Sequence, residues 1–509
     1  MRYNLFRLDI YKLEITEFMK LKTLPTLLAA LAALNLLTAH PSAAQRGAGG
    51  NSPDGAVNPM TATQAQPQRG GGEGGPPPDA PLPPGVKTTF VHLGNGEPAV
   101  LYEPVNPGPK AQIAVFTMHS AGDELTTSTC TELSKRGYRV FCVNNSNDKS
   151  RNFNDGVLDQ VNLETKKAVA YLRKYPGVTK IVLWGHSGGS TVATSYQDVA
   201  ENGVKACQDE VHVWKCPNSL ANMPPADGII LGDANWGIAN DVLTATDPAV
   251  EIDNGVKITH PELDMFNPAN GFNPAGSHYS PEFIHKFLVA QAKKNNEFVD
   301  LALKRYADIK ARKGNFDDDD VFIVAGSLFT GNKLYTSDMS LLNHTHAAWP
   351  LIHPDGSITT EIVHSIRVPT TRANPSHSFY GAALKTTLTG FLQTYALRVD
   401  PEKYGYGEET AETGVVWRST RASIPGNVEG ITVPLLTMGM TGSFEMGAAE
   451  TIHNHAKSKD KTLVYVEGAS HGYPTCKQCE KTPGQYGDTV KTIYDYADKW
   501  LSQPGRFIQ

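Results

Sequence analysis

A glycine-rich turn directly after an apolar strand constrains this chain more than any other feature of the sequence. Residues 178–184 (VTKIVLW) form a run typical of a strand buried on both faces of a sheet. Residues 185–189 (GHSGG) follow at once, and Thr191–Val199 is compatible with a helix. A G-x-S-x-G motif between a strand and a helix is typical of a sharp turn that lifts a serine hydroxyl clear of the sheet. We therefore predict that Ser187 is a nucleophile.

The turn also explains the residues around Ser187. Gly185 and Gly189 stand two residues before and after it, where larger side chains would collide with the strained backbone. His186 precedes Ser187, and Gly188 opens the following helix, whose N-terminal N–H groups point toward a developing negative charge.

Strands and helices alternate along the chain on either side of this turn. The strand candidates are 88–93 and 98–102, which form a hairpin, then 112–118, 138–143, 178–184 and 228–232. Residues 124–136 and 163–175 between them have helical character. This alternation predicts an α/β fold, with a mostly parallel central sheet flanked by helices.

The last part of the chain repeats the alternation and carries two polar residues at strand ends. A strand candidate at 431–440 is followed by Glu445, and a second at 461–467 is followed by His471. Helix-compatible segments at 448–458 and 489–501 follow each of these residues.

The order of strand, serine, acid and histidine resembles the α/β-hydrolase superfamily over residues 88–237 and 428–509. The resemblance implies that Ser187 attacks, that His471 is the general base and that Glu445 orients it. Asp233 is the alternative acid, because it follows the strand at 228–232 and some members of the superfamily carry the acid there.

The resemblance also implies an oxyanion hole made of two backbone N–H groups. One belongs to Gly188, and the other comes from the loop after residues 112–118, which reads His119-Ser120-Ala121-Gly122. The superfamily commonly has His-Gly at the first two positions, so Ser120 is a departure. It either tightens the turn or adds a hydroxyl to the site, and it leaves the second donor open between Ser120 and Ala121.

The expected hydrolase core consists of residues 87–237 and 428–509. Residues 238–427 are not required for this core and form an insertion in it. We expect them to form a large, mainly helical cap, with helices at 281–313 and 381–397 and a strand at 321–325. Aromatic residues and histidines are frequent in this insertion. Such a cap would line a substrate pocket, although any one of these rings is better assigned to the core of the cap itself.

The N-terminal region predicts export. The apolar run at 24–39 follows Lys20 and Lys22 and precedes the small residues Ser42-Ala43-Ala44, which predicts a signal peptide over 1–44. Met19 would be a cleaner start than Met1, and a retained membrane anchor is the alternative interpretation. Residues 45–86 are rich in Gly and Pro and predict a disordered tether. The expected location is secreted or periplasmic, with no membrane span after processing.

Six cysteines suit an oxidising compartment. Their spacing predicts local disulfides between Cys207 and Cys216 and between Cys476 and Cys479. Cys130 and Cys142 remain as a third pair. A lone CxxC lacks the second ligand pair of a zinc site, and we find no phosphate-binding loop, so we expect neither metal nor cofactor.

The formal net charge of −6 argues against nucleic acid as a partner. We expect a small-molecule or polymeric ester as the substrate of a serine hydrolase that acts on carboxylic esters. A peptidase, amidase or acyltransferase on the same fold is an alternative, as is an inactive binding module. The sequence does not indicate an oligomeric state.

Overall fold

The computed structural model of the 509-residue chain describes residues 81–508, apart from 95, 148–155, 252–253, 328–332 and 370–382. The expected signal peptide at 1–44, and nearly all of the expected tether at 45–86, lie outside the described residues. None of the helices in the described part is long and apolar enough to cross a membrane.

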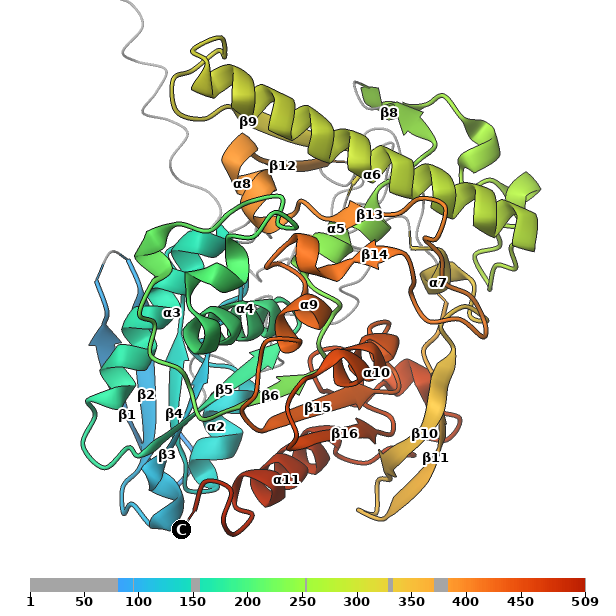
Figure 1. The fold of residues 1–509 in the computed structure, drawn as a ribbon. Helices are drawn as coiled ribbons and strands as arrows, with labels where there is room; N and C mark the ends of the chain where they lie inside the picture. Colours follow the sequence, from blue (N-terminus) through green and yellow to red (C-terminus); the bar gives the residue numbers. More distant parts are fainter. Residues whose placement is uncertain are drawn as a thin grey trace, which may run out of the picture. The chain divides into compact units, whose positions relative to one another are not determined.

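A ten-stranded sheet forms the centre of the described chain, in the order β1-β2-β4-β3-β5-β6-β15-β16-β10-β11 (Figure 1). Every neighbouring pair from β4 to β10 is parallel, and the outer pairs are antiparallel. The strands are β1 (Val86–His92), β2 (Pro98–Pro104), β3 (Ile113–Thr117), β4 (Arg139–Val143), β5 (Lys180–His186), β6 (Gly228–Gly232), β10 (His344–Ile352), β11 (Ile358–His364), β15 (Leu435–Met440) and β16 (Lys461–Val466).

Helices cover both faces of this sheet because the central strands are apolar on both faces. In β5, Leu183 belongs to an apolar cluster with residues of α3 (Leu158–Arg173), α4 (Gly188–Asn202) and α10 (Met446–His455). Its neighbours Val182 and Trp184 point to the opposite face and pack with α2 (Ser128–Lys135) and α11 (Thr489–Leu501). The predicted α/β architecture is thus confirmed.

The insertion between β6 and β15 contains one long helix and several short elements. The helix α6 (Pro281–Lys310) begins where Ser280 accepts a hydrogen bond from the Phe283 N–H, with Pro281 in the first turn. The other elements are α5 (Ile238–Ala245), β7 (Val250–Glu251), β8 (Asn254–Ile258), β9 (Val321–Ala325), α7 (Leu334–Ser337), β12 (Ala383–Thr387), α8 (Leu388–Thr394), β13 (Arg398–Val399), β14 (Val415–Val416) and α9 (Ile424–Val428).

The insertion has a core of its own and also contributes to the main sheet. Phe298, Phe322 and Phe391 pack together in it, as expected for rings that stabilise a cap. Two of its strands, β10 and β11, extend the central sheet beside β16. The aromatic residues Phe329, Phe379 and Tyr380, which the insertion also carries, lie outside the described residues.

The helix expected at 381–397 is wrong in its first half. Residues Ala383–Thr387 form β12, which pairs antiparallel with β9, and the helix α8 begins only at Leu388. The pairing partner is distant in sequence, so a local helical pattern could not reveal it. Thr387 then caps α8, because its side chain accepts a hydrogen bond from the Gly390 N–H at 3.2 Å.

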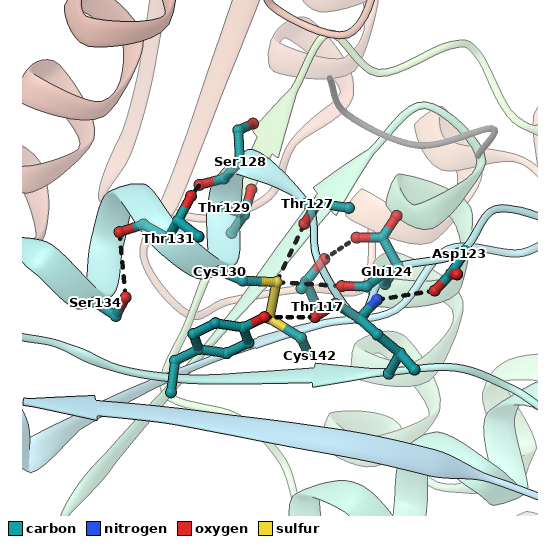
Figure 2. Close-up of a disulfide and its surroundings, with 12 residues drawn as sticks. Thr117, Asp123, Glu124, Thr127, Ser128, Thr129, Cys130, Thr131, Ser134 and Cys142 are labelled. Atoms are coloured by element: carbon teal, nitrogen blue, oxygen red, sulfur yellow. Dashed lines mark hydrogen bonds between the residues drawn. A yellow bond between two sulfur atoms is a disulfide. The ribbon is translucent and has the colours of Figure 1, made fainter. Parts of the chain in front are cut away.

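Three disulfides join the six cysteines: Cys130–Cys142, Cys207–Cys216 and Cys476–Cys479. The first ties α2 to β4 (Figure 2). Cys130 Sγ lies 3.1 Å from the carbonyl oxygen of Glu124, and the Glu124 carboxylate accepts a hydrogen bond from Thr117 Oγ1 at 3.0 Å. The disulfide therefore supports the segment that follows the predicted oxyanion loop.

Removal of this disulfide should lower both stability and activity. For Cys130→Ala/Cys142→Ala we expect a loss of about 3 kcal/mol in the free energy of unfolding, the entropic effect of opening a short loop. Since residues 119–124 then lose a support, turnover should also fall. Denaturant unfolding and ester turnover of the double variant measure these effects. Cys207→Ala/Cys216→Ala is the matched control, which should lose stability but keep its turnover, and equal turnover losses in both variants would contradict the prediction.

Candidate active site

The predicted site residues meet at one edge of the central sheet. Ser187 follows β5, Asp233 follows β6, and His471 follows β16. Glu445 lies in the loop after β15, between β6 and β16 in the sheet order (Figure 1). Because these four strands are parallel neighbours, their carboxyl ends lie side by side, which is where ligands bind in open α/β sheets.

Ser187 occupies a strained turn between β5 and α4. Its backbone has φ 49° and ψ −126°, a region that non-glycine residues rarely adopt. A Cβ on Gly185 would lie 2.5 Å from Ser190 Cα, and one on Gly189 would lie 2.9 Å from the Met118 carbonyl oxygen. The two glycines thus allow the close approach of backbone that the turn requires, and α4 begins immediately after the serine.

The imidazole of His471 pairs with Asp233. Its Nδ1 lies 2.6 Å from Asp233 Oδ2, and the Asp233 side chain is fully buried. Burial by itself would lower the pKa of His471. The hydrogen bond to Asp233 and the negative charges of Asp233, Glu445 and Asp241 outweigh burial and raise the pKa above its ordinary value. The carboxylate of Asp233 therefore favours the charged form of this imidazole.

Glu445, which the sequence favoured as the partner of His471, forms no hydrogen bond with that imidazole among the described residues. The Glu445 carboxylate lies instead 3.4 Å from the ammonium of Lys333, which is also 2.9 Å from Asp241 Oδ1. Burial raises the pKa of Glu445, while Lys333 acts in the opposite direction. Lys333 is only 1 % exposed, and a buried ammonium needs carboxylates around it. Glu445 is thus held by the insertion rather than by the histidine.

Lys333 and Phe444 are residues of this region that the sequence did not single out. The ring of Phe444 lies 5.3 Å from the ring of His471, and Lys333 Nζ lies 5.5 Å from the centre of the Phe444 ring. The insertion therefore supports the loop that packs against the histidine. No motif surrounds Lys333, so only the fold could bring it here.

Tyr473 fixes the His471 loop to the sheet. Its hydroxyl accepts a hydrogen bond from Trp184 Nε1 at 3.1 Å and donates one to the carbonyl oxygen of Gly232 at 3.4 Å. These contacts reach β5 and β6, the two strands that carry Ser187 and Asp233. The three chain segments of the site are thus joined by one buried phenol.

The loop after β3 narrows the choice of oxyanion donor. The N–H groups of Ala121 and Gly122 donate to His119 Nδ1 at 3.0 and 2.7 Å, so the Ala121 N–H is already used. Among the described residues, the N–H of Ser120 and the N–H of Gly188 have no acceptor. Of the two positions that the sequence left open, Ser120 is the one with a free N–H.

His186 lies between the turn at Ser187 and the loop that carries His471. Its ring centre is 4.8 Å from that of His471, and no hydrogen bond joins Ser187 to His471 within the described residues. Burial, with smaller contributions from His471 and His119, lowers the pKa of His186 well below its ordinary value. Burial therefore favours the neutral form of the His186 imidazole.

His186, Asp233 and His471 form the one set of potential metal ligands found in the described part of the chain. Ligand atoms of His186, Asp233 and His471 lie within 4.8 Å of one another. Asp233 and His471 are hydrogen-bonded to each other, so an acid–base pair accounts for two of the three residues.

Comparisons with known proteins found resemblance only at the level of structure. No family model matches the chain, and no curated protein matches its sequence. Among solved structures, a siderophore hydrolase, EstB, from Aspergillus fumigatus is 13 % identical, with a TM-score of 0.36 over 84 % of this chain and 99 % of that one. Brefeldin A esterase is 10 % identical, with a TM-score of 0.35 over 83 % of this chain and 80 % of that one. A proline iminopeptidase from Mycobacterium smegmatis is 12 % identical, with a TM-score of 0.33 over 82 % of this chain and 98 % of that one.

These TM-scores are low, and the fold is established by the chain's own features. They are the strand order of the parallel sheet, the strained serine between β5 and α4, and an acid and a histidine at the ends of later strands. The chain thus has an α/β-hydrolase fold.

Proposed function

We propose that the protein is an exported serine hydrolase that cleaves carboxylic esters through an acyl-enzyme on Ser187. The observation that carries the proposal is the pairing of His471 with the buried carboxylate of Asp233, next to a serine held in a strained strand-to-helix turn. A serine is a weak nucleophile unless a base takes its proton, and a histidine oriented by a carboxylate is such a base.

Acylation begins when Ser187 Oγ attacks the ester carbonyl carbon and His471 Nε2 accepts the hydroxyl proton. Asp233 holds the Nδ1–H of His471 and stabilises the imidazolium that forms. The carbonyl oxygen becomes an oxyanion, which the N–H groups of Gly188 and Ser120 receive. Each such donor contributes roughly 10²- to 10³-fold to the rate.

The intermediate collapses when His471 returns its proton to the alcohol oxygen, which leaves and gives the acyl-enzyme. Water then attacks the acyl carbon with His471 again as the base, and the acid departs from Ser187. An alcohol leaves more readily than an amine, so an ester is the less demanding substrate for this arrangement.

The proposed export rests on the sequence of residues 1–44 together with the three disulfides of the folded part. Disulfides persist in oxidising compartments, such as the periplasm and the extracellular medium.

A substrate panel on the full-length wild-type protein tests the proposal. p-Nitrophenyl esters of increasing acyl length should be hydrolysed, aminoacyl arylamides should be turned over far more slowly, and a fluorophosphonate probe should label the protein once. Turnover of amides alone would contradict the choice of ester. Absence of both turnover and labelling would contradict a serine hydrolase of any kind.

A further inference from the structure

The side chain of Ser120 lies directly against the backbone of Gly188. A Cβ placed on Gly188 would come within 2.3 Å of Ser120 Oγ, so this hydroxyl occupies the space that any other residue at 188 would fill. Ser120 is 1 % exposed, and among the described residues no group forms a hydrogen bond with its Oγ. A buried, unpartnered hydroxyl thus stands beside the N–H groups of the proposed oxyanion hole.

The surrounding loop is tightly held, which fixes the position of this hydroxyl. Asn145 Nδ2 donates to the carbonyl oxygens of His119 and Ser120 at 2.8 and 2.9 Å, and the Gly156 N–H donates to the same Ser120 carbonyl at 3.0 Å. The carbonyl of Ser120 is therefore fully used. Its N–H and its O–H are the two donors of this residue that remain without an acceptor among the described residues.

A buried hydroxyl without a partner destabilises the folded state, and such groups call for an explanation. Two explanations are available for the Ser120 hydroxyl: it only fills space in the turn, or its hydrogen-bond partner arrives with the substrate. The second explanation accounts for the position of the hydroxyl next to Gly188, which carries the other proposed N–H donor. The missing Cβ at 188 makes room for the hydroxyl at this place.

We propose that the Ser120 hydroxyl is a third donor of the oxyanion hole, alongside the N–H groups of Ser120 and Gly188. The inference rests on the proposed function, since it needs an oxyanion on the substrate carbonyl. The hydroxyl keeps its proton throughout and donates a hydrogen bond that strengthens as negative charge develops on that oxygen. It therefore acts on the transition state more than on the bound ester.

Ser120→Ala tests this assignment in the full-length protein. With p-nitrophenyl esters, we expect kcat to fall about 10²-fold while KM stays unchanged, as for the loss of one oxyanion donor. The affinity for a trifluoromethyl ketone, which forms a tetrahedral adduct on Ser187, should fall by the same factor. The melting temperature should hold or rise, because an unpartnered hydroxyl has been removed. Unchanged kcat and unchanged ketone affinity would overturn the inference.

Ser190→Ala is the matched control. Ser190 is fully buried in α4, and its Oγ also lacks a hydrogen-bond partner among the described residues. Ser190 is not among the proposed donors of the oxyanion hole, so this variant should keep wild-type kcat. Equal losses in Ser120→Ala and Ser190→Ala would indicate a packing effect and overturn the inference.

Gly188→Ala adds a test of the contact itself. Alone, it should reduce kcat, because the new methyl group collides with Ser120 Oγ. In the Ser120→Ala background that collision is absent, so the same substitution should cost much less. Independent, additive losses would overturn the placement of the hydroxyl. Failure of the proposed function has a different result, since the wild-type protein would then neither hydrolyse esters nor react with the fluorophosphonate.

Discussion

Replacement of Ser187 by alanine should abolish ester hydrolysis, with a fall in kcat of roughly 10⁶-fold. The loss is expected to be this large because no acyl-enzyme can form without the hydroxyl. Turnover of a p-nitrophenyl ester and labelling by a fluorophosphonate both measure it. The labelling should vanish in Ser187→Ala.

The folded state should survive this substitution. Alanine keeps the Cβ of the serine, and the close approaches that shape the turn involve the backbone of Gly185 and Gly189 instead. Its far-ultraviolet circular dichroism and melting temperature should therefore match the wild type. Labelling that persists in Ser187→Ala would show that another residue is the nucleophile.

Asp233→Asn should lower kcat by about 10⁴-fold, whereas Glu445→Gln should lower it by far less. The amide that replaces the Asp233 carboxylate cannot hold the Nδ1–H tautomer of His471 or stabilise its positive charge. Asparagine tolerates the positive φ of 48° at this position, so the backbone should stay in place. Each substitution replaces a carboxylate with an amide of the same shape, so the two variants are matched.

The pH profile of kcat/KM provides a second measurement of the same pair. His471 acts as a base only when neutral, so activity should rise with pH through its pKa, which lies above the ordinary value. Asp233→Asn removes the negative charge that favours the imidazolium. The pKa then falls, and the rising limb should move to lower pH. If Glu445→Gln moves the limb further and costs more activity than Asp233→Asn, Glu445 is the acid.

Much of this fold could be predicted because its signals are local. The apolar strands, the elbow at Ser187 and the helix after it are contiguous in sequence, so hydrophobic pattern and turn chemistry specify them together. The strand at 228–232 and the long helix that starts at Pro281 were also predicted from contiguous residues, and both occur in the structure.

The features that the sequence could not predict depend on contacts between segments that are distant in the chain. The strand β12 was predicted as helix, because its pairing partner β9 lies some 60 residues earlier and leaves no local mark. The choice between Asp233 and Glu445 had the same difficulty, since each follows a parallel strand and each carries a carboxylate. The histidine could reach either one on sequence grounds alone.

The class of fold and the chain order of the candidate nucleophile, the candidate acids and the histidine follow from contiguous patterns, so they can be derived without coordinates. Which carboxylate meets His471 depends on contacts between distant segments. Lys333, more than 100 residues from Glu445, holds that carboxylate with a buried ammonium, and Asp233 is left to the histidine. The choice between Ser120 and Ala121 as oxyanion donor also depends on the tertiary structure. In the folded loop, His119 Nδ1 accepts a hydrogen bond from the Ala121 N–H, so that N–H is already used.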